Sequence, residues 1–356
     1  MIRLAKPWIG EDEQRAVAAV LESGQLVQGE HVERFEHAVA ALVGRSHAVA
    51  VSSGTAALHL ALEAIGITDS DEVICPALTW PSPANAARLA GARVRFVDVD
   101  SGDWNARGTA FRDARDSDTK AAIVIDQFGN PARRAEIEAA LGDLPIIEDA
   151  ACAIGSRFPD GPCGTLGLVS CLSFHPRKII TTTEGGMCLT DDVNLAERIR
   201  VLRDHGRLGR SFVVPAGNFR MTEVAAALGL AQLQRLDEIV GRRRDLAVMY
   251  QQALGELLGM QSTPEGAESN YQTFGAVLPA DKNPDAFRAA LHDRGVESGL
   301  LSYAVHKLGS FAGNSASLPI AEHLAARGVS LPLYPQMRNT EVEEVIQSVR
   351  QVLDEQ

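Results

Sequence analysis

Short apolar runs alternate with segments of helical periodicity from about residue 11 to residue 205. This alternation is typical of stacked strand and helix units, in which helices cover both faces of a mainly parallel sheet. The runs that we expect to form strands are residues 47–52, 72–76, 94–98, 121–126, 145–149, 170–174 and 186–190. The sequence therefore predicts an α/β fold built on a large, mainly parallel sheet of seven strands.

Helices are expected between these strands, for example at residues 55–65 and 132–141, where apolar side chains recur at helical spacing. The alanine-rich residues 221–250 predict one long connecting helix with an interruption near Gly241. Three further segments predict a smaller α/β domain, namely residues 274–279, 285–294 and 341–353. We therefore expect a large domain over residues 1–240, including the N-terminal segment, and a small C-terminal domain over residues 241–356.

The composition argues against several classes of partner. Of the 356 residues, 46% are hydrophobic, which is enough for a sizeable core. The chain has 34 Lys and Arg against 46 Asp and Glu, a net charge of −12 and no basic block, so we expect no nucleic-acid partner. No apolar run has the length of a signal peptide core or a membrane span, which predicts a cytoplasmic protein without a membrane partner. The five cysteines form no CxxC pair, and we expect reduced thiols and no metal site.

The first motif with chemical meaning is residues 51–58, VSSGTAAL, where a strand breaks at Gly54 and a helix begins. Glycine permits close approach to the backbone, Thr55 adds a hydroxyl, and the helix N-terminus favours a phosphate. Serine and threonine also favour this position as ordinary helix caps. A phosphate site and a plain N-cap are both open interpretations at this point.

The second motif is an apolar strand that ends in two carboxylates, Glu148 and Asp149. Parallel sheets place their ligand sites at this end of the strands. An acid there could pair with a protonated ring nitrogen, as pyridoxal 5'-phosphate chemistry requires. The alternative is a strand-end aspartate that only caps the next turn.

The third motif is residues 172–178, LSFHPRK, followed by a turn rich in threonine and glycine. A lysine at this position, Lys178, can be partly desolvated beside other cations and act as a Schiff-base nucleophile. A single lysine is ordinarily only a solvated charge. The order of phosphate turn, acid and lysine, each at the carboxyl end of a predicted strand, favours the catalytic interpretation.

These motifs resemble those of the DegT/DnrJ/EryC1/StrS family of sugar aminotransferases over nearly the whole chain. The resemblance rests on residues 53–58, 148–151, 173–178, 184–186 and 217–221, and on the terminal segments 28–36 and 331–335. It implies a pyridoxal phosphate-dependent transferase of the aspartate aminotransferase fold, fold type I. It also implies a homodimer with shared active sites.

The resemblance implies that Lys178 bonds to the cofactor and shuttles a proton, and that Asp149 holds the pyridine nitrogen protonated. It implies further cofactor contacts for Gly54, Thr55, Ala56, Trp80, Cys152, Ser173 and, from the partner chain, Asn218. Four residues are candidates for contact with the substrate: His175, Arg220, Tyr303 and His306. Structural interpretations stay open, namely core or interface packing for Trp80, an ion pair for Arg220, and loop packing for Tyr303 and His306.

One residue departs from the pattern. The family usually has Gln or His near the cofactor's ring hydroxyl, and this chain has Cys152. A thiol is a weak hydrogen-bond donor, so either another side chain supplies that bond or the ring is held less firmly.

The resemblance predicts transfer of an amino group from an amino acid, expected to be glutamate, to a keto sugar, expected to be nucleotide-linked. One alternative is a keto-cyclitol aminotransferase of aminoglycoside-type pathways that uses glutamine as donor. Another is a regulator that binds pyridoxal phosphate without turnover. The presence of Lys178 argues against a dehydrating branch of the family that has His at this position.

Overall fold

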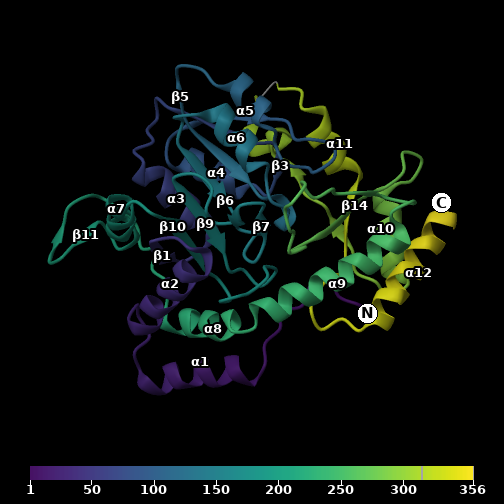
Figure 1. The fold of residues 1–356 in the computed structure, drawn as a ribbon, viewed down its shortest axis with the longest axis horizontal. Coiled ribbons are helices and arrows are strands. Elements are labelled where there is room, and N and C mark those ends of the chain that lie inside the picture. Colours follow the sequence, from purple (N-terminus) through teal and green to yellow (C-terminus); the bar gives the residue numbers. More distant parts are fainter. Residues whose placement is uncertain (314–315, 356) are drawn as a thin grey trace.

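The computed structural model describes residues 1–313 and 316–355. Its centre is a seven-stranded sheet in the order β1-β10-β9-β6-β5-β2-β4 (Figure 1). The strands are β1 (His47–Val51), β2 (Glu72–Pro76), β4 (Arg93–Val97), β5 (Thr119–Ile125), β6 (Ile146–Asp149), β9 (Val169–Ser173) and β10 (Gly186–Thr190). Only β10 runs antiparallel to its neighbours in this sheet, and every other pair is parallel. The predicted α/β fold is confirmed, and each predicted strand overlaps an observed one.

Helices cover both faces of this sheet because its strands are apolar on both sides. In β5, Ala122 and Val124 face one core, and Ala121 and Ile123 face the other. The first core is closed by α2 (Glu30–Val43), α5 (Gly108–Ala114), α6 (Arg134–Leu141) and α8 (Glu223–Leu233), and the second by α3 (Gly54–Ala64), α4 (Ser82–Leu89) and α7 (Val193–Arg203).

The prediction of one long connecting helix interrupted near Gly241 is wrong. The chain forms α8 and then α9 (Leu236–Leu254), and the break lies at residues 234–235. Near this break the N-terminal segment is bound: Gln232 Nε2 donates to the Trp8 carbonyl at 2.8 Å, and the Arg235 guanidinium lies 4.3 Å from the centre of the Trp8 ring. Gly241 is exposed inside α9, where a glycine costs only about 1 kcal/mol. The helix therefore breaks where tertiary contacts redirect the chain.

The C-terminal part carries a second sheet in the order β13-β14-β17-β15. It consists of β13 (Gly259–Met260), β14 (Phe274–Val277), β15 (Gly299–Leu300) and β17 (Gly328–Leu331), with α10 (Pro284–Asp293) and α12 (Asn339–Glu355). Each of the three segments predicted for a smaller domain overlaps β14, α10 or α12. The proposed division between residues 240 and 241 lies inside α9 and stays a prediction.

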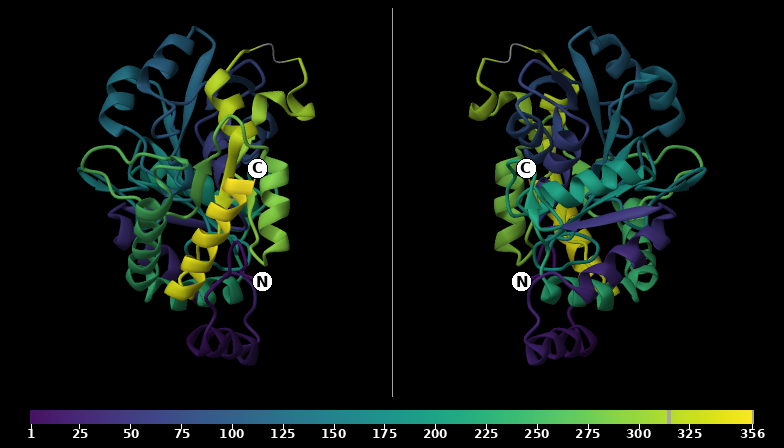
Figure 2. Two further views of the ribbon diagram at one scale, coloured as in Figure 1. Left: turned by 90° about the vertical axis from the view of Figure 1, so that its right-hand side faces the viewer. Right: turned by 90° about the vertical axis from the view of Figure 1, so that its left-hand side faces the viewer.

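Two elements extend away from the body of the molecule. Helix α1 (Glu11–Ser23) packs against α8 and lies at the lower edge of both side views in Figure 2. A hairpin of β11 (Arg207–Leu208) and β12 (Ser211–Phe212) extends beyond α7 in Figure 1 and exposes Leu208 and Phe212. Both elements expose apolar side chains.

The remaining elements are short, apart from α11. They are β3 (Leu78–Thr79), β7 (Arg157–Phe158), β8 (Gly161–Pro162), β16 (Tyr303–Ala304), α11 (Pro319–Arg327) and the 3₁₀ turns η1 (Gln127–Gly129), η2 (Val305–Lys307) and η3 (Gly309–Phe311). Among the described residues, no helix combines the length and the apolar character needed to span a bilayer.

Candidate active site

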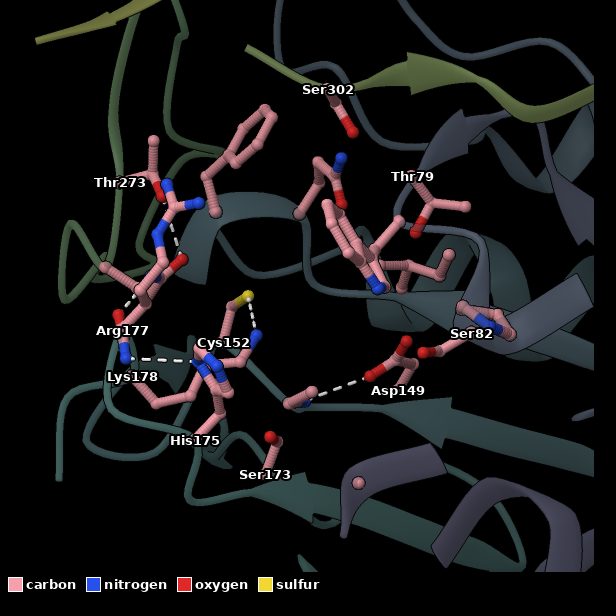
Figure 3. Close-up of a pocket in the computed structure, with 18 of the residues that line it drawn as sticks. Thr79, Ser82, Asp149, Cys152, Ser173, His175, Arg177, Lys178, Thr273 and Ser302 are labelled. Carbon is pink, nitrogen blue, oxygen red and sulfur yellow. Dashed lines mark hydrogen bonds between the residues drawn. The ribbon is translucent and has the colours of Figure 1, made fainter. Parts of the chain in front are cut away.

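One cavity of about 510 Å³ opens at the carboxyl ends of the parallel strands. Asp149 ends β6 and Ser173 ends β9, and both line the cavity. Its opposite wall comes from the C-terminal part of the chain, which pairs Tyr303 of β16 with Thr79 of β3. The cavity brings together nine of the predicted site residues, namely Gly54, Thr55, Trp80, Asp149, Cys152, Ser173, His175, Lys178 and Tyr303. Figure 3 labels Asp149, Cys152, Ser173, His175 and Lys178 among them.

The turn at the start of α3 has the features of an anion site. The Ser53 hydroxyl caps the helix by accepting from the Ala56 N–H at 3.1 Å. The first N–H groups of a helix have no partner within the helix. A Cβ atom at Gly54 would lie 2.7 Å from the Cβ of Ser173, so only glycine fits there without movement. The N-cap and phosphate interpretations are therefore compatible, because Ser53 caps and Gly54 lines the cavity.

Asp149 is a buried carboxylate without an ion-pair partner among the described residues. Its Oδ1 accepts one hydrogen bond, from the Ala151 N–H at 3.1 Å. Burial raises the pKa of Asp149, and attraction by Lys178 opposes the shift. A cationic group in the cavity would stabilise the ionised form of this carboxyl.

Lys178 is held close to Cys152. Its backbone N–H donates to the His175 carbonyl at 2.8 Å, and its Nζ donates to the Cys152 sulfur at 3.0 Å. Burial lowers the pKa of His175 and the nearby Glu184 raises it, with a net shift downward. His175 is therefore neutral at neutral pH and accepts from the Arg177 N–H at 3.2 Å.

Trp80 is an exposed aromatic residue of the cavity wall. Its ring packs edge to face on Tyr303, with 5.5 Å between centroids. Its exposed fraction of 61% distinguishes it from a core aromatic, and a cofactor ring could stack on it.

The remaining four predicted residues do not line this cavity. Ala56 lies in the first turn of α3, and Asn218 is exposed beside the β-bridge with Asp204. Arg220 forms an ion pair with Asp204, and His306 is buried with its Nε2 3.1 Å from Glu322 Oε1. Within one chain, Arg220 and His306 thus have structural partners, and their substrate roles stay predictions.

Several residues of the cavity wall were not among the predicted site residues. Thr55 Oγ1 lies 2.7 Å from Ser82 Oγ, which adds a second hydroxyl beside the anion turn. Other such residues are Arg177, Gln272, Thr273 and Ser302. Arg177 could have been selected from its place beside Lys178. The others carry no local signal, because the fold brings them from distant segments.

These residues fit pyridoxal phosphate. The cofactor has a phosphate, a basic ring nitrogen and an aldehyde, and the cavity offers an anion turn, a buried acid and an amine. The close approach at Gly54 and the unpaired buried carboxylate of Asp149 are the two observations of this structure that support the fit.

Comparisons with known proteins give the same answer. Residues 7–350 match the model of the DegT/DnrJ/EryC1/StrS aminotransferase family. The chain is 33% identical to GDP-perosamine synthase of Escherichia coli O157:H7 over 329 residues, which is 91% of this chain and 90% of that protein.

Solved structures share the complete fold. The aminotransferase TlmJ of Streptoalloteichus hindustanus is 34% identical with a TM-score of 0.94, covering 100% of this chain and 99% of that one. DesV of S. venezuelae is 32% identical with a TM-score of 0.91, covering 96% and 94%. GDP-4-keto-6-deoxymannose-3-dehydratase (ColD) with bound GDP-perosamine is 25% identical with a TM-score of 0.92, covering 98% and 100%. The chain therefore belongs to the DegT/DnrJ/EryC1/StrS aminotransferase family and is a pyridoxal phosphate-dependent sugar aminotransferase.

Proposed function

We propose that this enzyme moves an amino group from glutamate to the ketone of a nucleotide-linked keto sugar. The observation that carries the proposal is the meeting of Lys178, Asp149 and the Gly54 turn in one cavity of about 510 Å³. The relatives named for GDP-perosamine, or solved with it bound, support a nucleotide-linked acceptor.

In this proposal the cavity residues hold the cofactor at three points. The N–H groups of the Gly54 turn and the hydroxyls of Thr55 and Ser173 bind the phosphate. Asp149 keeps a proton on the ring nitrogen, and the charge of that nitrogen stabilises the buried carboxylate in return. Trp80 could stack on the ring, since this aromatic side chain lines the cavity and is largely exposed.

Pyridoxal phosphate, when bound, would supply an aldehyde carbon that accepts the amino nitrogen from the donor and passes it on, and a ring that withdraws electrons from the reacting carbon. Lys178 Nζ would take the proton from the α-carbon of the amino donor and, in the second half of the reaction, would deliver a proton to the former ketone carbon of the acceptor, as a general base and then a general acid. Its contact with Cys152 at 3.0 Å holds the amine inside the cavity when it is free. His175, neutral because burial lowers its pKa, adds no positive charge beside Lys178.

We also propose a homodimer with shared active sites. Asn218 is exposed and does not line the cavity of its own chain, which agrees with a role in the cavity of a partner. The exposed apolar side chains of the β11–β12 hairpin and the end of α1 supply surface for such an interface.

The test is a substrate screen with wild type and Lys178→Ala. Glutamate and glutamine are each combined with nucleotide-linked keto sugars and keto-cyclitols, and aminated products are identified by mass spectrometry. We expect product from glutamate and a nucleotide-linked sugar, and a loss of at least about a hundredfold in Lys178→Ala, because a general acid and base is removed. Unchanged melting of the variant is the control for folding.

Two results would contradict this assignment. Near-normal turnover by Lys178→Ala would remove the lysine from the mechanism. Product formed only with glutamine and a keto-cyclitol would replace the proposed donor and acceptor.

A further inference from the structure

Arg177 is a cation in the active-site cavity that has no anionic partner. Its side chain is exposed and lines the cavity, and it forms no ion pair or side-chain hydrogen bond within residues 1–313 and 316–355. Other exposed arginines of this acidic chain do have such a partner, as in the pairs of Arg15 with Glu11 and of Arg112 with Asp113. The Arg177 guanidinium therefore makes no ion pair or hydrogen bond that stabilises the described part of the fold.

The backbone of Arg177 is fixed although its guanidinium is free. The N–H donates to His175 Nδ1 at 3.2 Å, and the carbonyl accepts from Gln272 Nε2 at 2.7 Å. Gln272 is held in turn, because Thr273 Oγ1 donates to its Oε1 at 2.9 Å. The backbone position of Arg177 directly beside Lys178 is thus fixed, while its side chain is free to reach a ligand.

Arg177 lies away from the hydroxyls beside the proposed phosphate turn. In Figure 3, Arg177 lies on the Lys178 side of the cavity, and Ser82 lies on the opposite side. Ser82 marks the proposed phosphate turn, since its hydroxyl is 2.7 Å from Thr55 Oγ1. Arg177 is therefore separated from the Thr55 and Ser82 hydroxyls, and Ser173, the other hydroxyl assigned to the phosphate, lies between Arg177 and Ser82 in this view.

The carboxylates of the cavity wall do not neutralise Arg177. Asp126 and Asp149 are buried at the carboxyl ends of β5 and β6, and Glu184 is exposed but forms no ion pair with any described residue. A carboxylate or phosphate of a ligand could bind the Arg177 guanidinium without breaking an existing ion pair.

We propose that Arg177 binds an anionic group of the substrate and so orients the reacting carbon toward Lys178. The inference rests on the proposed function, which supplies two anions of this chemistry: the α-carboxylate of the amino donor and the diphosphate of a nucleotide sugar. A guanidinium binds either as a planar fork with two hydrogen bonds, which lysine cannot reproduce.

The experiment compares holoenzymes of wild type, Arg177→Ala and Arg177→Lys, with Arg350→Ala as the matched control. Arg350 is an exposed arginine of α12, away from the cavity, and within residues 1–313 and 316–355 its side chain bonds only to the Ala253 carbonyl. Donor binding is measured by titrating L-glutamate against the cofactor absorbance. Diphosphate binding is measured by calorimetry with GDP, UDP and dTDP. We expect dissociation constants to rise about ten- to hundredfold in Arg177→Ala for one class of anion, as the loss of a charge-assisted hydrogen bond predicts.

The pattern identifies the anion. A rise for glutamate alone assigns Arg177 to the α-carboxylate, a rise for the diphosphates alone assigns it to the nucleotide, and Arg177→Lys should be intermediate in either case. Equal binding by Arg177→Ala and Arg350→Ala, or no binding of any of these anions by wild type, overturns the inference. The proposed function is judged separately, by the aminated product of wild type, so a failed screen with Arg177-dependent anion binding would reject that function and leave this site.

Discussion

Cys152 is the residue at which this chain departs from its family, and the structure gives its thiol a partner. The sulfur accepts a hydrogen bond from Lys178 Nζ at 3.0 Å, while the backbone carbonyl of Cys152 accepts from Asn270 Nδ2 at 2.8 Å. The backbone is therefore anchored, and the side chain is half-buried at the edge of the cavity. Space for a longer side chain lies on the cavity side.

Cys152→Gln should therefore tighten pyridoxal phosphate binding by a few-fold to about tenfold, because a neutral hydrogen bond to the ring hydroxyl contributes about 0.5 to 1.5 kcal/mol. Cofactor dissociation constants measure this, and Cys152→Ala, which adds no donor, is the control that should not tighten binding. Weaker binding in Cys152→Gln would mean that the site has been rebuilt around the thiol and that glutamine overpacks it.

Two buried carboxyl groups lie close together at the cavity, Asp126 in its wall and Glu148 outside its lining. Glu148 accepts from the N–H groups of Gly164 and Leu166, each at 2.8 Å, and Asp126 Oδ1 accepts from the Ala132 N–H at 2.8 Å. Burial, followed by repulsion from Glu148, raises the pKa of Asp126 well above its ordinary value. Burial therefore favours the protonated form of Asp126.

Asp126→Asn should be tolerated, because the amide oxygen can still accept from Ala132 and the amide nitrogen can donate toward Glu148. We expect its unfolding free energy within about 1 kcal/mol of wild type and a loss of about 1 to 3 kcal/mol in Asp126→Ala, which leaves polar groups unpaired. A folded pKa above the unfolded value stabilises wild type fully at low pH, and this contribution is lost as the pH rises. Asp126→Asn does not titrate, so its stability relative to wild type should rise as the pH increases from the ordinary value of 3.8 toward the raised folded pKa. Urea unfolding at several pH values measures this, and a difference constant with pH would refute the protonated aspartate.

At the scale of elements, the contact between the start of α3 and the end of β9 forms the proposed phosphate turn. It depends on a missing side chain, since a Cβ at Gly54 would lie 2.7 Å from Ser173 Cβ, closer than such atoms approach. The glycine is required here by the neighbouring strand, not by the conformation of the helix.

Gly54→Ala should separate α3 from β9 and weaken cofactor binding by more than about tenfold, with a stability loss of about 1 to 3 kcal/mol from overpacking. Adding Ser173→Gly removes the opposing Cβ and should recover much of the stability. Ser173→Gly alone is the control for the lost hydroxyl. Cofactor titration and thermal melting report the two effects, and wild-type affinity in Gly54→Ala would exclude this turn as the phosphate site.

For the whole molecule, the exposed apolar side chains at two extended elements indicate where a second copy would bind. Phe212 on the β11–β12 hairpin is 69% exposed, and Val27 after α1 is 67% exposed. Asn218 follows the same hairpin and is also exposed. The proposed dimer would cover these side chains and bring Asn218 to the partner's phosphate turn.

Mixing Lys178→Ala with Asn218→Ala chains tests this shared site. Each variant alone should be nearly inactive, but a heterodimer joins one intact Lys178 to an intact Asn218 of the other chain. Random exchange of equal amounts makes half of the dimers mixed, so activity should approach about a quarter of wild type. Chains carrying both substitutions, mixed with Lys178→Ala, are the control without an intact combination. Sedimentation as a monomer, together with no recovery, would contradict the dimer.

The sequence by itself determined the architecture. Local sequence patterns predict the seven strands and the helices of the large sheet, because buried side chains recur at the spacing of a strand or a helix. They also predict the order of anion turn, acid and lysine, because these residues lie at the ends of strands. Only tertiary packing explains the helix break at residues 234–235, where Gln232 contacts the N-terminal segment. Only tertiary packing places Gln272 in the cavity wall. It also decided that His306 contacts Glu322 and that the Lys178 amine meets Cys152. Contacts between segments that are distant in the sequence produce no periodic pattern of residues, so only the folded structure shows them.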